Sequence, residues 1–150
     1  GDGSCNEGCE KDLENMENLN AVCLDTDVIV DYLRGREPGR SAFMHWRKKA
    51  DTFITSITAF ELLLGANLSS KRARRRLEVE SLLHQLKILD FNRESVEKAA
   101  EKGAELKAKG EPIDIRDLFN ASICLTTSIP ILTKNKKHYQ RIRELKVLTP

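Results

Sequence analysis

The feature that most constrains the fold of this chain is the alternation of short apolar runs with longer helical stretches. The apolar or β-branched runs are short, at residues 21–24, 52–56, 86–89, 131–133 and 146–148. The segments between them have helical spacing or helix-ending residues, at 28–33, 38–49, 58–66, 72–85, 93–109, 115–127 and 136–143. Strands that alternate with helices form βαβ units, whose parallel strands are covered by helices on both faces. We therefore expect an α/β fold: a three-layer α/β/α sandwich around a central, mainly parallel five-stranded sheet.

The charge of the chain divides it into two parts. Residues 1–20 carry six acidic residues and one lysine and have few apolar side chains, which predicts an acidic leader, a tag or a disordered segment, outside the fold. Residues 21–150 are predicted to form one folded domain, since 150 residues suit a single core. The net charge of the whole chain is +2, so the domain itself is basic, which weakly favours a polyanionic partner.

Apolar runs and cysteines exclude several classes of protein. No apolar run approaches the ~20 residues that a membrane span needs, so we expect no membrane association. Cys5 and Cys9 are spaced C-x₃-C, but no second pair follows at zinc-site spacing. Cys23 and Cys124 lie in apolar stretches and are predicted to be small buried side chains. This pattern is typical of a cytoplasmic protein without a disulfide framework.

Acidic and polar side chains stand near the ends of the predicted strands. Asp25 follows the first strand, Glu61 lies in the helix after the second, Asp117 opens the helix before the fourth, and Asn135 follows the fourth. Ligands of open α/β sheets bind at the carboxyl ends of the strands, so these groups are expected to converge. Converging carboxylates repel one another unless a cation neutralises them. Oxygen ligands without paired His or Cys favour Mg²⁺ or Mn²⁺, the metals of phosphodiester hydrolysis.

Three acidic residues in this region have simple structural interpretations. Glu61 follows Thr58 at capping-box spacing, and the spacing alone does not choose between capping and metal binding. Asp27 is expected to cap the helix that follows it and to position the loop. Asp114 is expected to be the N-cap of the helix that begins at residue 115.

Three segments and a closing strand occur in an order that identifies a family. They are VCLDTDVIVDYLRG (22–35), ITSITAFELLLGA (54–66) and IRDLFNASICLTTSIPILTKNKKHYQRI (115–142). Together they resemble the PIN domain, and most closely the VapC-like toxin ribonucleases of prokaryotic toxin–antitoxin pairs. The resemblance covers about residues 21–150 and makes them a PIN-like nuclease domain. It implies a metal-dependent endoribonuclease that uses Mg²⁺ or Mn²⁺, acts on RNA, forms a homodimer, and is inhibited by an antitoxin whose segment covers the active-site groove.

The resemblance also assigns roles to individual residues. Asp25, Glu61 and Asp117 correspond to the catalytic, metal-binding acids, and Asn135 stands at the fourth metal position. Many members have Asp at that position. Asn keeps an oxygen ligand but loses a charge, which leaves a one-metal mechanism open. Thr133 resembles the hydroxyl residue that supports the acidic cluster in the family. Asp114 has no fixed role in the family, and we expect it and Thr26 to support the site as well.

Two groups of basic residues are candidates for contact with RNA. Lys134, Lys136 and Lys137 flank the fourth metal position and are predicted to bind phosphate. A denser cluster opens the helix at 72–85 and contains Lys71, Arg72, Arg74, Arg75 and Arg76. Contact with RNA, a solvated surface and a partner-facing helix all remain open for this cluster.

Two other functions fit part of the pattern. In a haloacid-dehalogenase-like phosphohydrolase, Asp25 and Asp27 would be the nucleophile and the acid/base of an Asp-x-Asp motif. Val28 and Ile29 stand where that family has Gly-Thr, however. The second alternative is a PIN-like scaffold that binds RNA or protein without cutting, which Asn135 favours.

Overall fold

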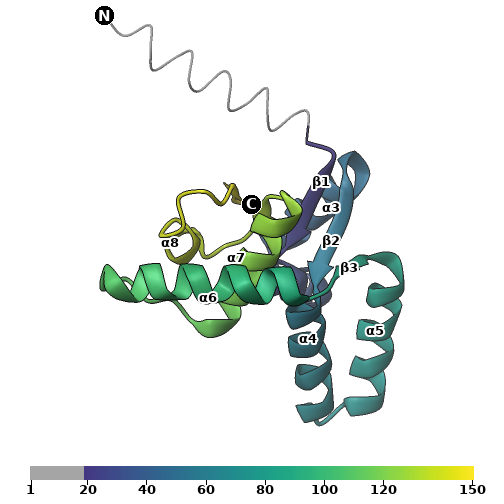
Figure 1. Ribbon diagram of the computed structural model, residues 1–150. Coiled ribbons are helices and arrows are strands. Elements are labelled where there is room, and N and C mark those ends of the chain that lie inside the picture. The colour runs from purple at the N-terminus through teal and green to yellow at the C-terminus, as the bar shows by residue number, and fades with distance from the viewer. Residues whose placement is uncertain (1–18) are drawn as a thin grey trace, which may run out of the picture.

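The computed structural model describes residues 19–150 (Figure 1). Its centre is a five-stranded parallel sheet. The strands are β1 (Ala21–Leu24), β2 (Asp51–Thr55), β3 (Lys87–Leu89), β4 (Ile131–Leu132) and β5 (Val147–Leu148). They are arranged in the order β3-β2-β1-β4-β5, and every pairing is parallel. The predicted fold class is therefore confirmed, whereas residues 1–18 of the predicted acidic leader lie outside the described residues.

The helices occupy the intervals that the sequence pattern predicts. They are α2 (Thr26–Arg34), α3 (Gly39–Lys49), α4 (Ser56–Leu68), α5 (Arg72–Gln85), α6 (Arg93–Ala108), α7 (Ile115–Thr127) and α8 (Lys136–Tyr139). The largest difference is α8, which ends at Tyr139 and not at residue 143. Ser56, predicted to end a strand, instead begins α4 directly after β2. Within the described part of the chain, no helix has the length and apolar character of a membrane span.

Two hydrophobic cores lie on opposite faces of the sheet. Successive strand residues point to opposite faces, so Val22 and Leu24 of β1 join one core and Cys23 joins the other. Helices α2, α3, α4 and α5 complete the first core with side chains such as Phe43. Helices α6, α7 and α8 complete the second, which includes Cys124. Cys23 and Cys124 are free and buried, as the sequence predicts.

The order of the strands places a functional edge beside β1. The chain runs outward from the central β1 to β2 and β3, and then crosses back to β4 and β5 on the other side. Strand order therefore reverses between β1 and β4, which is where ligands bind in open α/β sheets. The backbone N–H of Asp25 donates to the carbonyl of Leu132 at 2.9 Å, which ties the ends of the two strands together. Residues that directly follow β1 and β4 must therefore lie side by side.

Candidate active site

Asp25 is the buried centre of this edge. It is 7% exposed, and its Oδ2 accepts a 2.7 Å hydrogen bond from the Thr133 hydroxyl, while its Oδ1 accepts from the backbone N–H of Thr26 at 2.9 Å. Burial, together with the nearby charges of Asp27 and Asp117, raises the pKa of Asp25 to about 7, although these hydrogen bonds oppose the shift. The charge of Asp25 is therefore only partly compensated by the protein around it.

Asp27 does not cap the helix, so that expectation is wrong. Asp25 is the N-cap of α2, because β1 ends at Leu24 and the helix begins one residue after Asp25. Asp27 lies in the first helical turn, and its Oδ2 accepts a 3.0 Å hydrogen bond from the backbone N–H of Lys134. Its Oδ1 is buried without a hydrogen-bond partner in the structure, and burial raises the pKa of this carboxyl. Asp27 therefore leaves one oxygen free beside Asp25.

Glu61 does not form a capping box with Thr58. Thr55 caps α4, since its hydroxyl accepts from the backbone N–H of Thr58 at 3.0 Å. Glu61 is thus in the second turn, where its Oε1 accepts a 3.1 Å hydrogen bond from the Thr26 hydroxyl. Its Oε2 lies 3.4 Å from Arg116 Nη1. Glu61 is therefore directed toward α2 and α7 and does not serve the start of its own helix.

Asp117 enters from the opposite side of the edge, on the first turn of α7. Its Oδ1 accepts from the Tyr139 hydroxyl at 3.2 Å, and its Oδ2 lies 3.4 Å from His138 Nδ1. Burial and the charges of Asp25 and Asp117 raise the pKa of Tyr139, which keeps this hydroxyl protonated as a donor. The side-chain amide nitrogen of Asn135 lies 2.8 Å from the same His138 nitrogen. Asp117 and Asn135 are therefore positioned by neighbouring residues of α8.

The structure brings the four predicted metal-binding residues, Asp25, Glu61, Asp117 and Asn135, to one open groove of about 420 Å³. The other residues that line it are Thr26, Asp27, Val30, Asp31, Arg34, Arg36 and Lys134. Five carboxylates and three cations therefore face the groove, which leaves an excess of negative charge. This balance fits the binding of a cation.

The remaining predicted residues lie around the groove or away from it. Thr133 is fully buried beneath it and supports Asp25. Asp114 is the N-cap of α7, as expected, and lies outside the lining; Arg116 joins it to Glu61 through contacts of 3.3 and 3.4 Å. Lys136 and Lys137 are exposed on α8 and do not line the groove. Of the three predicted phosphate-binding lysines, only Lys134 reaches it.

Asp31, which was not among the predicted site residues, contacts Lys134. Asp31 is 6% exposed, and its Oδ2 lies 2.9 Å from Lys134 Nζ and accepts from the backbone N–H of Gly39 at 3.1 Å. The hydrogen bond from Lys134 lowers the pKa of Asp31. A side chain at residue 39 would collide with the Cβ of Asp31, so this position requires glycine. The spacing of Asp27 and Asp31, four residues apart on α2, was the available signal that both face the groove.

The donor set suits a hydrated divalent cation better than a closed metal cage. Within residues 19–150, no group of three or more Asp, Glu, His or Cys side chains is arranged to hold a metal ion. Mg²⁺ retains several waters and binds through one or two carboxylates, so a looser arrangement fits it. The unpartnered Oδ1 of Asp27 and the raised pKa of Asp25 are both consistent with a positive group in the groove.

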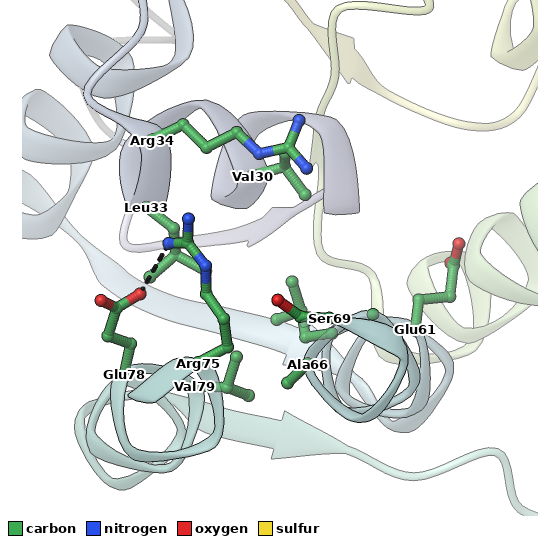
Figure 2. A pocket seen from close by; sticks show the side chains of 11 residues that line it. Val30, Leu33, Arg34, Glu61, Ala66, Ser69, Arg75, Glu78 and Val79 are labelled. Carbon is green, nitrogen blue, oxygen red and sulfur yellow. Dashed lines mark hydrogen bonds and ion pairs between the residues drawn. The ribbon is translucent and has the colours of Figure 1, made fainter. Parts of the chain in front are cut away.

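A second concave surface adjoins the groove. This pocket has a volume of about 240 Å³ and lies between α2, α4 and α5. It shares Val30, Arg34 and Glu61 with the groove. In Figure 2, Arg34 extends from α2 on one side, while Arg75 rises from α5 on the other and pairs with Glu78. The acidic groove thus opens into a pocket with basic groups on two sides.

Comparisons with known proteins agree with this fold. The family model of the PIN domain matches residues 22–145. Ribonuclease VapC1 of Methanocaldococcus jannaschii is 30% identical over 138 residues, which cover 90% of this chain and 89% of that protein. Ribonuclease VapC2 of Rickettsia felis is 32% identical over 123 residues, covering 81% and 92%. The crystal structure of VapBC2 from Rickettsia felis, bound to a DNA fragment from its promoter, matches with a TM-score of 0.79 at 25% identity, covering 87% and 98%.

The chain therefore belongs to the PIN-domain family and, within it, to the VapC group. This membership does not support the interpretation of Asp25 and Asp27 as a phosphohydrolase pair. Asp27 is held by the backbone of Lys134 and lies in the first turn of α2.

Proposed function

We propose that this chain is a metal-dependent endoribonuclease and the toxin of a toxin–antitoxin pair. The observation that carries the proposal is that Asp25, Glu61 and Asp117, from three separate elements, line one groove with an excess of carboxylates. Relatives that share most of the chain are named ribonucleases. Groups of this kind are costly to bring together unless they serve a cation or a reaction.

The proposed metal is Mg²⁺ or Mn²⁺, held by Asp25 and Asp117 with Glu61 and Asn135 acting directly or through water. When bound, such an ion activates water and stabilises negative charge on a phosphate. Thr133 and Thr26 hold the Asp25 and Glu61 carboxylates through the hydrogen bonds described above. Asn135 supplies an oxygen without a charge, which favours one ion over two.

The substrate contacts in this proposal come from the cations of the groove. Lys134 lies beside Asp27 and Asp31 and would contact a phosphate of RNA through an N–H that Asp31 does not use. Arg34 and Arg36 line the same groove and extend its positive side. Lys136 and Lys137 would act only on RNA that extends beyond the groove, because they are exposed on α8.

The proposed protein partner is an antitoxin that covers the groove. The solved relative from Rickettsia felis is a VapBC2 assembly, and it matches 87% of this chain. A basic side chain of the antitoxin entering a groove with five carboxylates would form charge-assisted hydrogen bonds and exclude RNA. A homodimer of this chain, implied by the resemblance to the family, is part of the same proposal.

Cleavage of RNA tests this function. The purified, antitoxin-free chain is incubated with a mixed pool of structured and single-stranded RNA in Mg²⁺, Mn²⁺ or EDTA. We expect fragments with either metal, none with EDTA, and none with Asp25→Asn protein. The matched control is Asp51→Asn, which makes the same substitution at an exposed side chain and should cleave normally. RNA binding that chelator does not affect, without cleavage in either metal, would instead support the non-catalytic scaffold.

A further inference from the structure

The junction of α4 and α5 carries a concentration of positive charge that the proposed chemistry does not use. A shallow concave surface there, called the hairpin tip below, is lined by Ser69, Ser70, Lys71, Arg72, Ala73, Arg74 and Arg76. Arg74 and Arg76 pair with Glu78 and Glu80 at 3.3 and 3.0 Å. Lys71 and Arg72 are exposed and form no ion pair within the described residues. Cations therefore outnumber carboxylates at the tip.

These cations do not serve the stability of α5. They stand at the start of the helix, where the macrodipole is already positive, and the first turn contains no acidic residue. Lys71 is the N-cap and makes no side-chain capping bond. The hairpin is instead held together by apolar side chains such as Leu62, Val79 and Leu82. These cations destabilise the start of the helix locally, so their presence is explained better by the binding of a ligand than by folding.

Three neighbouring concave surfaces lie between the catalytic edge and the hairpin tip: the groove, the pocket and the tip itself. The groove and the pocket share Glu61 and Arg34, and the pocket and the tip share Ser69. Glu61 and Leu68 are seven residues apart on α4, which is about 10 Å at 1.5 Å per residue. The two helices extend away from the sheet beyond the end of β2 (Figure 1), and Arg75 reaches into the pocket between tip and groove (Figure 2). Basic groups thus occur along the whole path.

We propose that the hairpin tip binds the phosphate backbone of the RNA strand that passes through the groove. This inference rests on the proposed function, because it extends the RNA site beyond the carboxylates. The ion pairs of the tip are exposed and stabilise the chain little, so phosphates can replace Glu78 and Glu80 as partners at small cost. Each phosphate contact then adds affinity that decreases with salt. The shared lining residues that link the tip to the groove favour RNA over an acidic protein as the occupant.

Binding of RNA to tip variants tests the inference. All variants carry Asp25→Asn so that the RNA remains intact, and the probe is a fluorescein-labelled single-stranded RNA of mixed sequence. The tip variant is Lys71→Gln/Arg72→Gln/Arg74→Gln. The control, Arg93→Gln/Lys98→Gln/Lys107→Gln, removes the same charge from the surface of α6. We expect the tip variant to bind at least about tenfold more weakly at low salt, with a salt slope about 2 smaller, while the control changes little. The Tm of the tip variant should be unchanged or higher, because the substitutions remove cations from the start of α5.

Two outcomes of the binding experiment would overturn the inference. The first is equal loss of RNA affinity in the tip and control variants, which would reduce the tip to a contribution to net charge. The second concerns polyglutamate, a probe that mimics an acidic protein. If the tip variant loses affinity for polyglutamate as much as for RNA, the tip is a surface for acidic protein. Cleavage assays with Asp25 restored separate the two proposals. If the tip variant keeps its KM in a chain that cleaves RNA, this inference alone fails. If no chain cleaves but the tip still binds RNA, the nuclease proposal fails.

Discussion

Two regions of the molecule bury charge in opposite ways. In the groove, Asp25 is 7% exposed among other carboxylates, and burial raises its pKa to about 7. On α6, Lys102 is 8% exposed, but its Nζ lies 3.0 Å from Glu144 and 3.3 Å from Glu105. These partners raise the pKa of Lys102 although burial opposes them. The buried charge of Lys102 thus has partners of opposite sign, whereas the buried charge of Asp25 has neighbours of its own sign.

The difference separates structure from function. The contact of Lys102 with Glu144 attaches α6 to the loop before β5, so it stabilises the fold without a ligand. The groove gains little from the charge of Asp25 until a cation arrives, because desolvation and like charges both disfavour it. A substitution in the groove should therefore affect activity and spare the fold. A substitution at Lys102 should do the reverse.

The largest effect is expected for Asp25→Asn and Asp117→Asn. Each removes a carboxylate from the groove, so cleavage of RNA should decrease by at least about 100-fold, as for the loss of a major electrostatic group. Stability without metal should be unchanged or increased, because repulsion is relieved. Single-turnover cleavage and thermal unfolding in EDTA measure the two effects, with Asp51→Asn as the control. Large losses of Tm in both variants would show that these residues are structural.

Lys102→Met is expected to have the opposite profile. The buried ammonium loses two carboxylates, but both partners are about half exposed and return to water. We therefore expect a loss of about 1–2 kcal/mol in the free energy of unfolding, less than for a fully buried pair. The control is Lys98→Met, whose pair with Glu101 on the same helix is more exposed and should matter less. Cleavage per folded molecule should remain normal in both variants. A loss of kcat in Lys102→Met would contradict a purely structural role for Lys102.

The pH dependence of stability should also reveal the groove. The pKa of Asp25 rises from 3.8 in the unfolded chain to about 7 in the fold, so protonation favours the folded state. This contribution is fully present below pH 3.8 and is lost as the pH rises through 7, with an upper size of roughly 4 kcal/mol.

Urea unfolding of the wild type in EDTA should thus show a decrease in stability between pH 4 and 7 that Asp25→Asn lacks. Identical pH profiles for the two proteins would contradict this.

A smaller effect is expected for Asp31→Asn. The amide oxygen still accepts from Gly39, but the charge that holds Lys134 is lost. Lys134 then samples other positions, so KM for RNA should rise severalfold while kcat changes less. Asp51→Asn makes the same change in an exposed pair with Lys87 and should leave KM unaltered. A fall in Tm with no change in KM would assign Asp31 to folding alone.

Much of this molecule follows from local patterns in the sequence. The apolar runs predict the strands, because a buried parallel strand requires them, and Asp25 is placed by the strand that precedes it. Their positions near the predicted strand ends indicate Glu61 and Asp117, and the resemblance to the PIN domain assigns them to the metal site. Spacing alone does not exclude a capping role for Glu61, because that role depends on where α4 begins, and Thr55 rather than Thr58 caps it.

Contacts between distant segments could not be predicted in the same way. Asp31 and Lys134 are more than 100 residues apart, and only the closeness of β1 and β4 brings them together. Lys136 and Lys137 lie outside the lining of the groove for the same reason, since sequence proximity to Asn135 does not place them in it. Arg116, which bridges Asp114 and Glu61, likewise depends on the packing of α7 beside α4.

Binding of Mn²⁺ tests most directly whether the groove keeps its carboxylates together for a cation. The wild type, Asp25→Asn, Asp117→Asn and Asp51→Asn are titrated with Mn²⁺ by calorimetry above pH 7, where Asp25 is ionised. We predict saturable binding by the wild type and Asp51→Asn, and at least about tenfold weaker binding when either groove aspartate is replaced. Equal affinity in all four proteins, or no binding by the wild type, would contradict the account.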